Sequence, residues 1–252
     1  MRRAAAFALP ALLLAGCAAA SQAPAQTDAL TIENRYPLEY AKQFTVDVCA
    51  GGYDLITIDG SRYLVVPEGA AAPANLDADI TVLQQPIRNI YLVSSSAMDP
   101  IISIGGLGAV ALSGTQAENW YLDAARTAME QGEIAYAGKY SAPDYETILS
   151  ADCGLAIENT MIYHTPEVKE QLEKFGVPVL VERSSYESDP LARMEWVKLY
   201  GILLGRTEEA ERIFDDAVQR IAPLLDEKPT GKTAAFFSIT SNNLATVRKG
   251  GD

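Results

Sequence analysis

The sequence has a single histidine, His164, and this scarcity excludes several kinds of site. Receptors for bare zinc or manganese ions draw heavily on imidazole, so a free-metal receptor is disfavoured. A Ser-His-Asp triad would have to recruit His164, and the sequence has no Gly-x-Ser-x-Gly elbow to present a nucleophile. Hydroxyls such as those of Ser94, Ser95 and Ser96 more often bond a ligand or cap a helix. We find no convincing catalytic constellation.

Positive charge is also scarce. The chain has 20 Lys and Arg residues against 33 Asp and Glu, which gives a formal net charge of −13. Binding to nucleic acid requires clustered Lys and Arg on phosphates, and no basic cluster is present. We therefore predict no nucleic-acid partner.

Only three cysteines occur, at positions 17, 49 and 153. Cys49 and Cys153 stand in apolar, strand-like surroundings more than a hundred residues apart. An exported protein could join them in a disulfide, whereas buried free thiols fit the same surroundings equally well. The sequence leaves both possibilities open.

Long apolar runs are missing except at the N-terminus. Residues 1–16 combine two arginines, an apolar stretch and small residues, which predicts a secretory signal peptide. The Leu-Ala-Gly-Cys run that ends at Cys17 resembles the lipobox of bacterial lipoproteins, which implies that Cys17 is acylated. An ordinary signal peptide with an incidental cysteine is the alternative. Residues 17–30 are expected to form a flexible, lipid-anchored tether, and the remainder to be soluble and exported.

Hydrophobic periodicity organises the rest of the chain. From Phe44 to Pro67, apolar residues alternate at period two between glycine-bearing turns, which predicts a small antiparallel meander. Strands and helices alternate after residue 80, which predicts an α/β fold with a parallel sheet flanked by helices. The four strands are expected at Ile87–Val93, Ala109–Leu112, Leu155–Ile157 and Val177–Val181.

Each of these strands runs into a polar segment, at residues 94–96, 113–121, 158–161 and 182–187. In parallel sheets, ligands collect beyond the carboxyl ends of the strands. We therefore expect the four segments to form a binding edge. Two long helices follow, at 191–204 with Gly205 after it and at 207 to about 225. Thr233–Ile239 is then expected to be a buried strand.

Four segments, in order behind the lipobox, resemble the substrate-binding lipoproteins of ABC importers for iron-siderophore complexes and cobalamin. They are Pro86-x-Arg88-x-Ile90-x-Leu92 with the helix after it, Glu146-x-x-Leu149 before Leu155-Ala156-Ile157, Phe175-Gly176-Val177-Pro178-Val179, and the YGILLGRTEEA run from Tyr200 to Ala210. Together they span roughly residues 44 to 240. Cys153-Gly154 departs from the Pro-Asp usual in the family at that turn.

The resemblance implies two α/β lobes joined by one long helix. The N-terminal lobe would span residues 31–206, the inter-lobe linker helix 207–227, and an incomplete C-terminal lobe 228–252. A complete second lobe needs on the order of a hundred residues. The apolar stripe of the linker helix and the strand after it are therefore expected to lack much of their cover.

The resemblance also implies partners. Glu146 would dock on an ABC permease, which acts with its ATPase, and a lipid on Cys17 would hold the protein at the membrane. The ligand would be an iron chelate of the siderophore type, with no cofactor; cobalamin or haem, or an exported hydrolase, are alternatives. The candidate ligand contacts are Ser94, Ser95, Ser96, Gln116, Asn119, Trp120, Tyr121, Asn159, Thr160, Met161, Arg183 and Tyr186.

Overall fold

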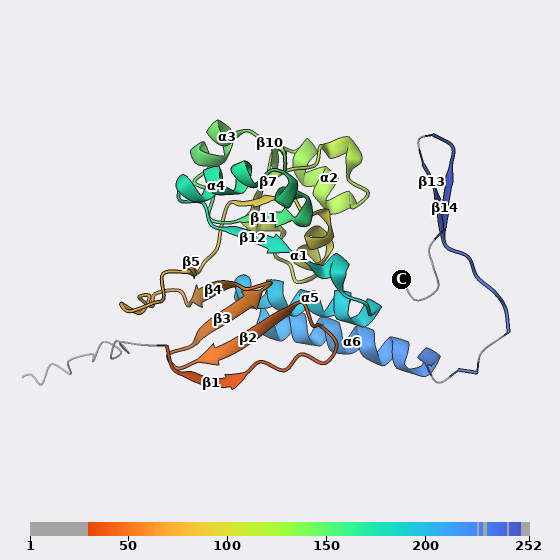
Figure 1. Cartoon of the computed structure of the whole chain (residues 1–252), viewed down its shortest axis with the longest axis horizontal. Helices are drawn as coiled ribbons and strands as arrows, with labels where there is room; N and C mark the ends of the chain where they lie inside the picture. Colours follow the sequence, from red (N-terminus) through yellow and green to blue (C-terminus); the bar gives the residue numbers. More distant parts are fainter. Residues whose placement is uncertain (1–29, 226, 229–230, 241, 248–252) are drawn as a thin grey trace, which may run out of the picture.

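The computed structural model describes residues 30–225, 227–228, 231–240 and 242–247. The predicted signal peptide, the acylated Cys17 and the tether as far as residue 29 lie outside the described residues. Within them, two five-stranded sheets pack with helices into one body, and a short hairpin stands apart from it (Figure 1).

The first sheet, which we call the N-terminal sheet, has the strand order β1-β2-β3-β4-β5. Its strands are β1 (Ile32–Arg35), β2 (Phe44–Cys49), β3 (Tyr53–Ile58), β4 (Ser61–Val66) and β5 (Ile80–Gln84). β2, β3 and β4 pair antiparallel, so the predicted meander is confirmed. The sequence reading missed β1 and also β5, which returns after a long loop to pair parallel with β4.

The second sheet is wholly parallel and confirms the predicted fold class. Its order is β12-β11-β6-β7-β8, so the chain starts in the middle, fills one side and then crosses to the other. The strands are β6 (Ile90–Leu92), β7 (Val110–Ser113), β8 (Ala135–Tyr136), β11 (Ala156–Asn159) and β12 (Val179–Glu182). The two-residue β8 was not predicted, because it is too short to show a period.

Helices cover both faces of the parallel sheet. They are α1 (Met98–Ser103), α2 (Asp123–Glu130), α3 (Tyr145–Ser150), α4 (Pro166–Lys174), α5 (Pro190–Leu203) and α6 (Thr207–Leu225). Buried residues of α3 and α4 form one apolar cluster with one face of the sheet. Residues of α1, α2 and α5 form a second cluster with the other face and with the N-terminal sheet. Small elements complete the chain: the 3-10 turns η1 (Ser95–Ala97), η2 (Leu107–Ala109), η3 (Ala117–Asn119), η4 (Thr160–His164) and η5 (Ser184–Tyr186), and the strands β9 (Gly138–Lys139) and β10 (Ala142–Pro143).

α5 lies in the core shared by the two sheets (Figure 1). Its Trp196 packs edge-on against Phe44 of β2, with ring centroids 4.9 Å apart. The phenol of Tyr63 on β4 donates a hydrogen bond of 3.0 Å to the carbonyl of Val179 on β12, so the sheets also touch directly. The N-terminal sheet is thus an integral part of the lobe.

α5 and α6 cross closely where Gly201 faces Ala210. A Cβ on Gly201 would lie 2.5 Å from the Cβ of Ala210, so a larger residue would force the helices apart. α5 ends before Gly205, which adopts φ +65°, so the helix end predicted there is confirmed. α6 confirms the predicted long helix, and its role as a link between lobes stays a prediction.

Two buried carboxylates fix the loop before β2 to α5. The Glu195 carboxylate accepts hydrogen bonds of 2.8–2.9 Å from the backbone N–H groups of Glu39, Tyr40 and Ala41 and from the Lys198 ammonium. Burial alone would raise the pKa of Glu195, but these donors outweigh it and hold that pKa below its usual value. We call this arrangement the Glu195 clamp.

Glu187, which precedes α5, reinforces the same contact. Its carboxylate accepts from the backbone N–H groups of Lys42 and Gln43 and from the indole N–H of Trp196. The backbone N–H groups of residues 39–43 therefore donate to the carboxylates of Glu187 and Glu195, which are about 150 residues away in the sequence.

One predicted strand was placed wrongly. The segment expected to be a buried strand at 233–239 forms only β13 (Phe237–Ile239), which pairs with β14 (Ala245–Val247) in an exposed hairpin. Phe236 and Phe237 are 75% and 64% exposed. The apolar composition indicated burial, but no described element packs against this hairpin; its lack of cover was expected.

The two described cysteines are free thiols. Cys49 packs in a small apolar cluster of the N-terminal sheet, and Cys153 against the α3 and α4 side of the parallel sheet. Burial raises the pKa of each thiol. The cysteines therefore do not form the disulfide that the sequence left open; the Cys49 thiol is buried and the Cys153 thiol is half-buried.

We predict that Glu195→Gln destabilises the protein by roughly 3 kcal/mol or more, because an amide offers one acceptor where four donors converge and leaves Lys198 buried without a counter-charge. Urea unfolding measures the loss, and hydrogen exchange at Tyr40 and Ala41 should quicken. Glu39→Gln, in the same loop but exposed, serves as the control and should change little. Equal stabilities for the two variants would contradict the clamp.

Candidate functional site

The carboxyl ends of the parallel strands meet at one edge, as predicted. The register sets Leu92 opposite both Ser113 and Ile157, and Asn159 opposite Glu182. The polar segments that follow β6, β7, β11 and β12 therefore emerge side by side. Their contact with a ligand stays a prediction.

Glu182 ends β12, the outermost strand on one side of the parallel sheet, and its side chain is buried. One of its carboxylate oxygens accepts hydrogen bonds from the hydroxyls of Ser94 (2.9 Å) and Ser96 (2.8 Å), and the other from the backbone N–H of Ser184 (2.7 Å). These bonds join the segment after β6 to the segment after β12. The Ser94 hydroxyl is buried in this network and is not available to a ligand, which corrects its expected role.

Arg183 is already paired, which also differs from expectation. Its guanidinium donates to Asp59 in the β3–β4 turn at 2.8 Å and lies 4.5 Å from the ring centre of Tyr186. The Tyr186 phenol in turn donates to the Thr160 hydroxyl at 3.4 Å. Arg183 therefore holds the N-terminal sheet to the edge and is not a free charge for an anionic ligand.

The segment after β7 contains four of the predicted ligand contacts, and three of them are exposed. Gln116, Asn119 and Tyr121 are exposed, and the Tyr121 side chain is 97% exposed. Trp120 is only 5% exposed and donates its indole N–H to the Ser113 hydroxyl at 3.2 Å. The prediction that Trp120 offers a flat contact to a ligand is therefore wrong, because its ring is part of the core.

The segment after β11 is partly occupied by its own backbone. The Asn159 side-chain oxygen accepts from the backbone N–H of Met161 at 2.9 Å and thereby caps η4. Thr160 is half-buried, and Met161 is 45% exposed. Ser95 is exposed on η1.

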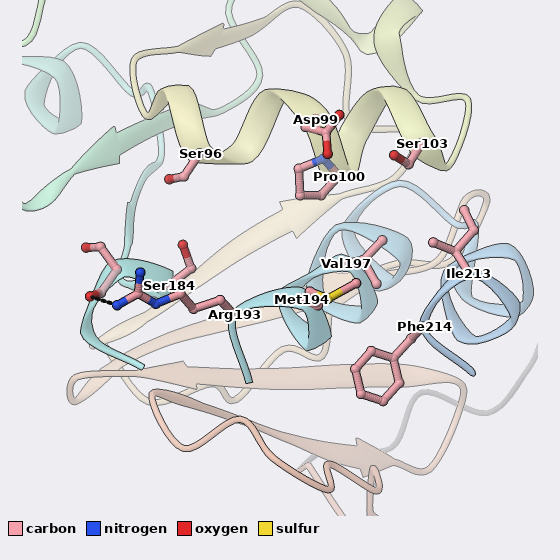
Figure 2. A pocket seen from close by; sticks show the side chains of 11 residues that line it. Ser96, Asp99, Pro100, Ser103, Ser184, Arg193, Met194, Val197, Ile213 and Phe214 are labelled. Atoms are coloured by element: carbon pink, nitrogen blue, oxygen red, sulfur yellow. Dashed lines mark hydrogen bonds between the residues drawn. The ribbon is translucent and has the colours of Figure 1, made fainter. Parts of the chain in front are cut away.

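A cleft of about 380 Å³ opens beside this edge, between α1, η5, α5 and α6 (Figure 2). Its size is within the range of small-molecule sites. Of the predicted ligand contacts, the cleft includes Ser96. The lining residues are Ser96, Asp99, Pro100, Ser103, Ser184, Ser185, Arg193, Met194, Val197, Ile213 and Phe214.

Sequence reasoning missed most of these residues for a definable reason. Arg193 and Met194 belong to a helix whose other residues are largely buried, and periodicity cannot tell that their side of α5 faces a cleft. Ile213 and Phe214 were assigned to the apolar stripe of the next helix, and the fold brings that stripe to the same cleft.

Glu158 contradicts its predicted place at the polar edge. It lies inside β11 on the α3 and α4 side of the sheet, is fully buried, and neither of its carboxylate oxygens has a hydrogen-bond partner in the described part of the chain. Burial raises the pKa of Glu158 to about 8, so its carboxyl is protonated at neutral pH. The sequence suggested that β11 ends before Glu158, whereas the strand includes Glu158 and its side chain faces the core.

In the part of the chain that the structure describes, no group of three or more His, Cys, Asp or Glu side chains is placed to hold a metal ion. Nor does any helix within the described ranges have the length and apolar character needed to cross a bilayer.

Comparison with known proteins finds one curated relative and several solved structures with a similar fold. No family model matches the chain. A curated relative, an uncharacterized lipoprotein of Methanocaldococcus jannaschii, is 21% identical over 174 residues, which are 64% of this chain and 41% of the relative. The chain thus spans about two fifths of the length of the curated relative that it matches.

Two solved structures align with a TM-score of 0.50. The periplasmic haem-binding protein HutB of Vibrio cholerae is 16% identical, over 64% of this chain and 58% of that one. Holo-ViuP is 15% identical, over 81% of this chain and 59% of that one. The chain therefore has the fold of the periplasmic binding proteins, as the resemblance in its sequence implied.

We predict that Glu158 makes stability depend on pH. Between about pH 4.5 and 8 the folded state holds a proton on Glu158 that the unfolded chain has lost. The free energy of unfolding should therefore fall as pH rises through this window, by up to about 1.4 kcal/mol per pH unit, and level off above it. Urea midpoints of the parent and of Glu158→Gln, measured at several pH values, test this.

The Gln variant should lack this slope, since its amide does not ionise. Glu170→Gln, an exposed change on α4, is the matched control and should follow the parent. Parallel profiles for the parent and Glu158→Gln would show that Glu158 ionises normally.

Proposed function

We propose that this chain is an extracytoplasmic solute-binding lipoprotein that captures an iron chelate of the siderophore type and delivers it to an ABC permease and its ATPase. The observation that carries the proposal is the cleft beside the carboxyl edge of the parallel sheet, in a fold shared with periplasmic binding proteins. In sheets of this kind the crevice beyond the carboxyl ends is the usual ligand site.

The chemistry of the edge supports a binding role. Exposed hydroxyl, amide and aromatic groups are available from Ser95, Gln116, Asn119, Tyr121 and Tyr186. Such groups bind a bulky ligand through hydrogen bonds and flat contacts without any reaction. Cobalamin or haem would suit the same kind of edge.

A hydrolase is a weaker proposal. His164 is exposed at the end of η4, and in the described residues it makes no hydrogen bond to a serine or a carboxylate. Ser94 and Ser96 donate to the buried Glu182 carboxylate, and in the described residues no histidine is hydrogen-bonded to either hydroxyl. We therefore propose binding without catalysis.

The proposed partners lie on two other surfaces. Acylation of Cys17 would keep the chain at the outer face of the cytoplasmic membrane or in the periplasm. Glu146 is exposed in the first turn of α3, beside a groove of about 440 Å³ that Glu133 also lines. Two carboxylates beside a groove suit a basic side chain of a permease.

The proposal predicts that the full chain binds at least one of five probes: ferric citrate, ferric enterobactin, ferrioxamine B, cyanocobalamin and haem. Trp196 precedes the cleft-lining Val197 on α5, so a bound coloured chelate should quench its fluorescence, and calorimetry gives the stoichiometry. Glu146→Ala should bind the same chelate equally well and lower its uptake by cells that carry the cognate permease.

Glu170→Ala, another exposed carboxylate change, is the control and should leave binding and uptake unchanged. The proposal of a chelate receptor is overturned if none of the five probes binds. Normal uptake with Glu146→Ala would remove Glu146 from the permease contact.

A further inference from the structure

The cleft has two chemically different ends. Ser96, Ser184 and Arg193 lie toward one end, while Val197, Ile213 and Phe214 lie toward the other, on the same side as Ser103 (Figure 2). The polar end adjoins the carboxyl edge of the sheet, and the apolar end is built by α5 and α6.

Arg193 carries a positive charge, and some of its N–H groups are not used in hydrogen bonds within the protein. Its Nε donates to the carbonyl of Glu187 at 3.1 Å, and one terminal nitrogen donates to the carbonyl of Ser185 at 3.3 Å. No carboxylate lies within ion-pair distance of Arg193 in the described residues. A guanidinium has five N–H groups, so these two bonds leave others for a ligand. Arg193 is exposed, its printed hydrogen bonds go only to neutral carbonyls, and no ion pair in the described residues neutralises its charge.

The neighbouring groups agree with an anion at this end. Ser184 and Ser185 line the cleft with Arg193, and within the described residues neither hydroxyl has a hydrogen-bond partner; Ser184 is buried and Ser185 exposed. The Glu182 carboxylate behind them is already satisfied by two serines and a backbone N–H. Arg183, by contrast, forms an ion pair with Asp59.

The other end accepts an uncharged body. Met194 is 41% exposed and Ile213 half-buried, so apolar atoms are available to a ligand at the mouth and wall of the cleft. Asp99, on the first turn of α1, also lines the cleft and would repel a second anion placed toward the middle. The charges that line the cleft therefore favour a ligand with one acidic group, bound near Arg193, and an uncharged, mainly apolar remainder.

We propose that the ligand is an amphipathic acid: a carboxylate or similar anion bound by Arg193 and the hydroxyls of Ser184 and Ser185, and an apolar, flat body over Met194, Val197 and Ile213. This inference rests on the proposed function and narrows its ligand class. It selects against compact polar chelates, which offer nothing to the apolar end, and against cationic ones, which Arg193 repels.

The test uses protoporphyrin IX, which has carboxylates on an apolar ring, and its dimethyl ester, in which the same carboxylates are masked. Both are titrated in the same dilute detergent into the full chain. The free acid should bind roughly tenfold or more tightly than the ester, because hydrogen bonds to charged groups are strong. Arg193→Gln should reduce that ratio to near one, and Arg193→Lys should restore part of it.

Arg183→Gln is the matched control, since it removes an arginine that is already paired, and it should keep the acid-to-ester ratio. An unchanged ratio in Arg193→Gln would overturn the inference, as would equal binding of acid and ester by the parent. If ferrioxamine B or ferric citrate binds and protoporphyrin does not, the inference fails while the receptor function stands. If no chelate binds, the proposed function itself fails.

Discussion

The buried carboxylate of Glu195 is the constraint on which the arrangement of the lobe depends. It sits in α5, a helix buried on nearly every side, and gathers three backbone N–H groups from the loop before β2 together with the Lys198 ammonium. A carboxylate in such a place is tolerated only when donors surround it. The loop, the N-terminal sheet and α5 are therefore fixed to one another, and the parallel sheet packs on the same helix.

This bracing has a consequence for the site. α5 carries Arg193, Met194 and Val197 to the cleft, and the edge network around Glu182 meets it from the ends of the strands. Groups that are held by rigid elements bind with less loss of conformational freedom than groups on free loops. The cleft is accordingly lined by a braced helix, and Arg193 is oriented there by hydrogen bonds to two backbone carbonyls.

Much of the fold followed from local patterns in the sequence. Alternating strands and helices predicted the parallel sheet, and polar residues after each strand predicted the edge, because both depend on short-range periodicity. Very short or isolated strands such as β8 gave no period, and β5 was hidden after a long loop. Residues whose roles depend on distant partners were mispredicted: Arg183 pairs with Asp59, Trp120 turns into the core, and Glu158 faces the sheet interior. Arg193 was missed because nothing near it in sequence distinguishes a cleft-facing side of α5.

The central claim is that ligand is held at the carboxyl edge of the parallel sheet, and a hydrogen-exchange footprint of the full chain with and without haem tests it most directly. The account predicts slower exchange in residues 93–103 and 183–198, which form the edge and cleft, with no change in the exposed hairpin at 237–247. Protection confined to that hairpin would mean that haem merely coats apolar surface, and would contradict the account.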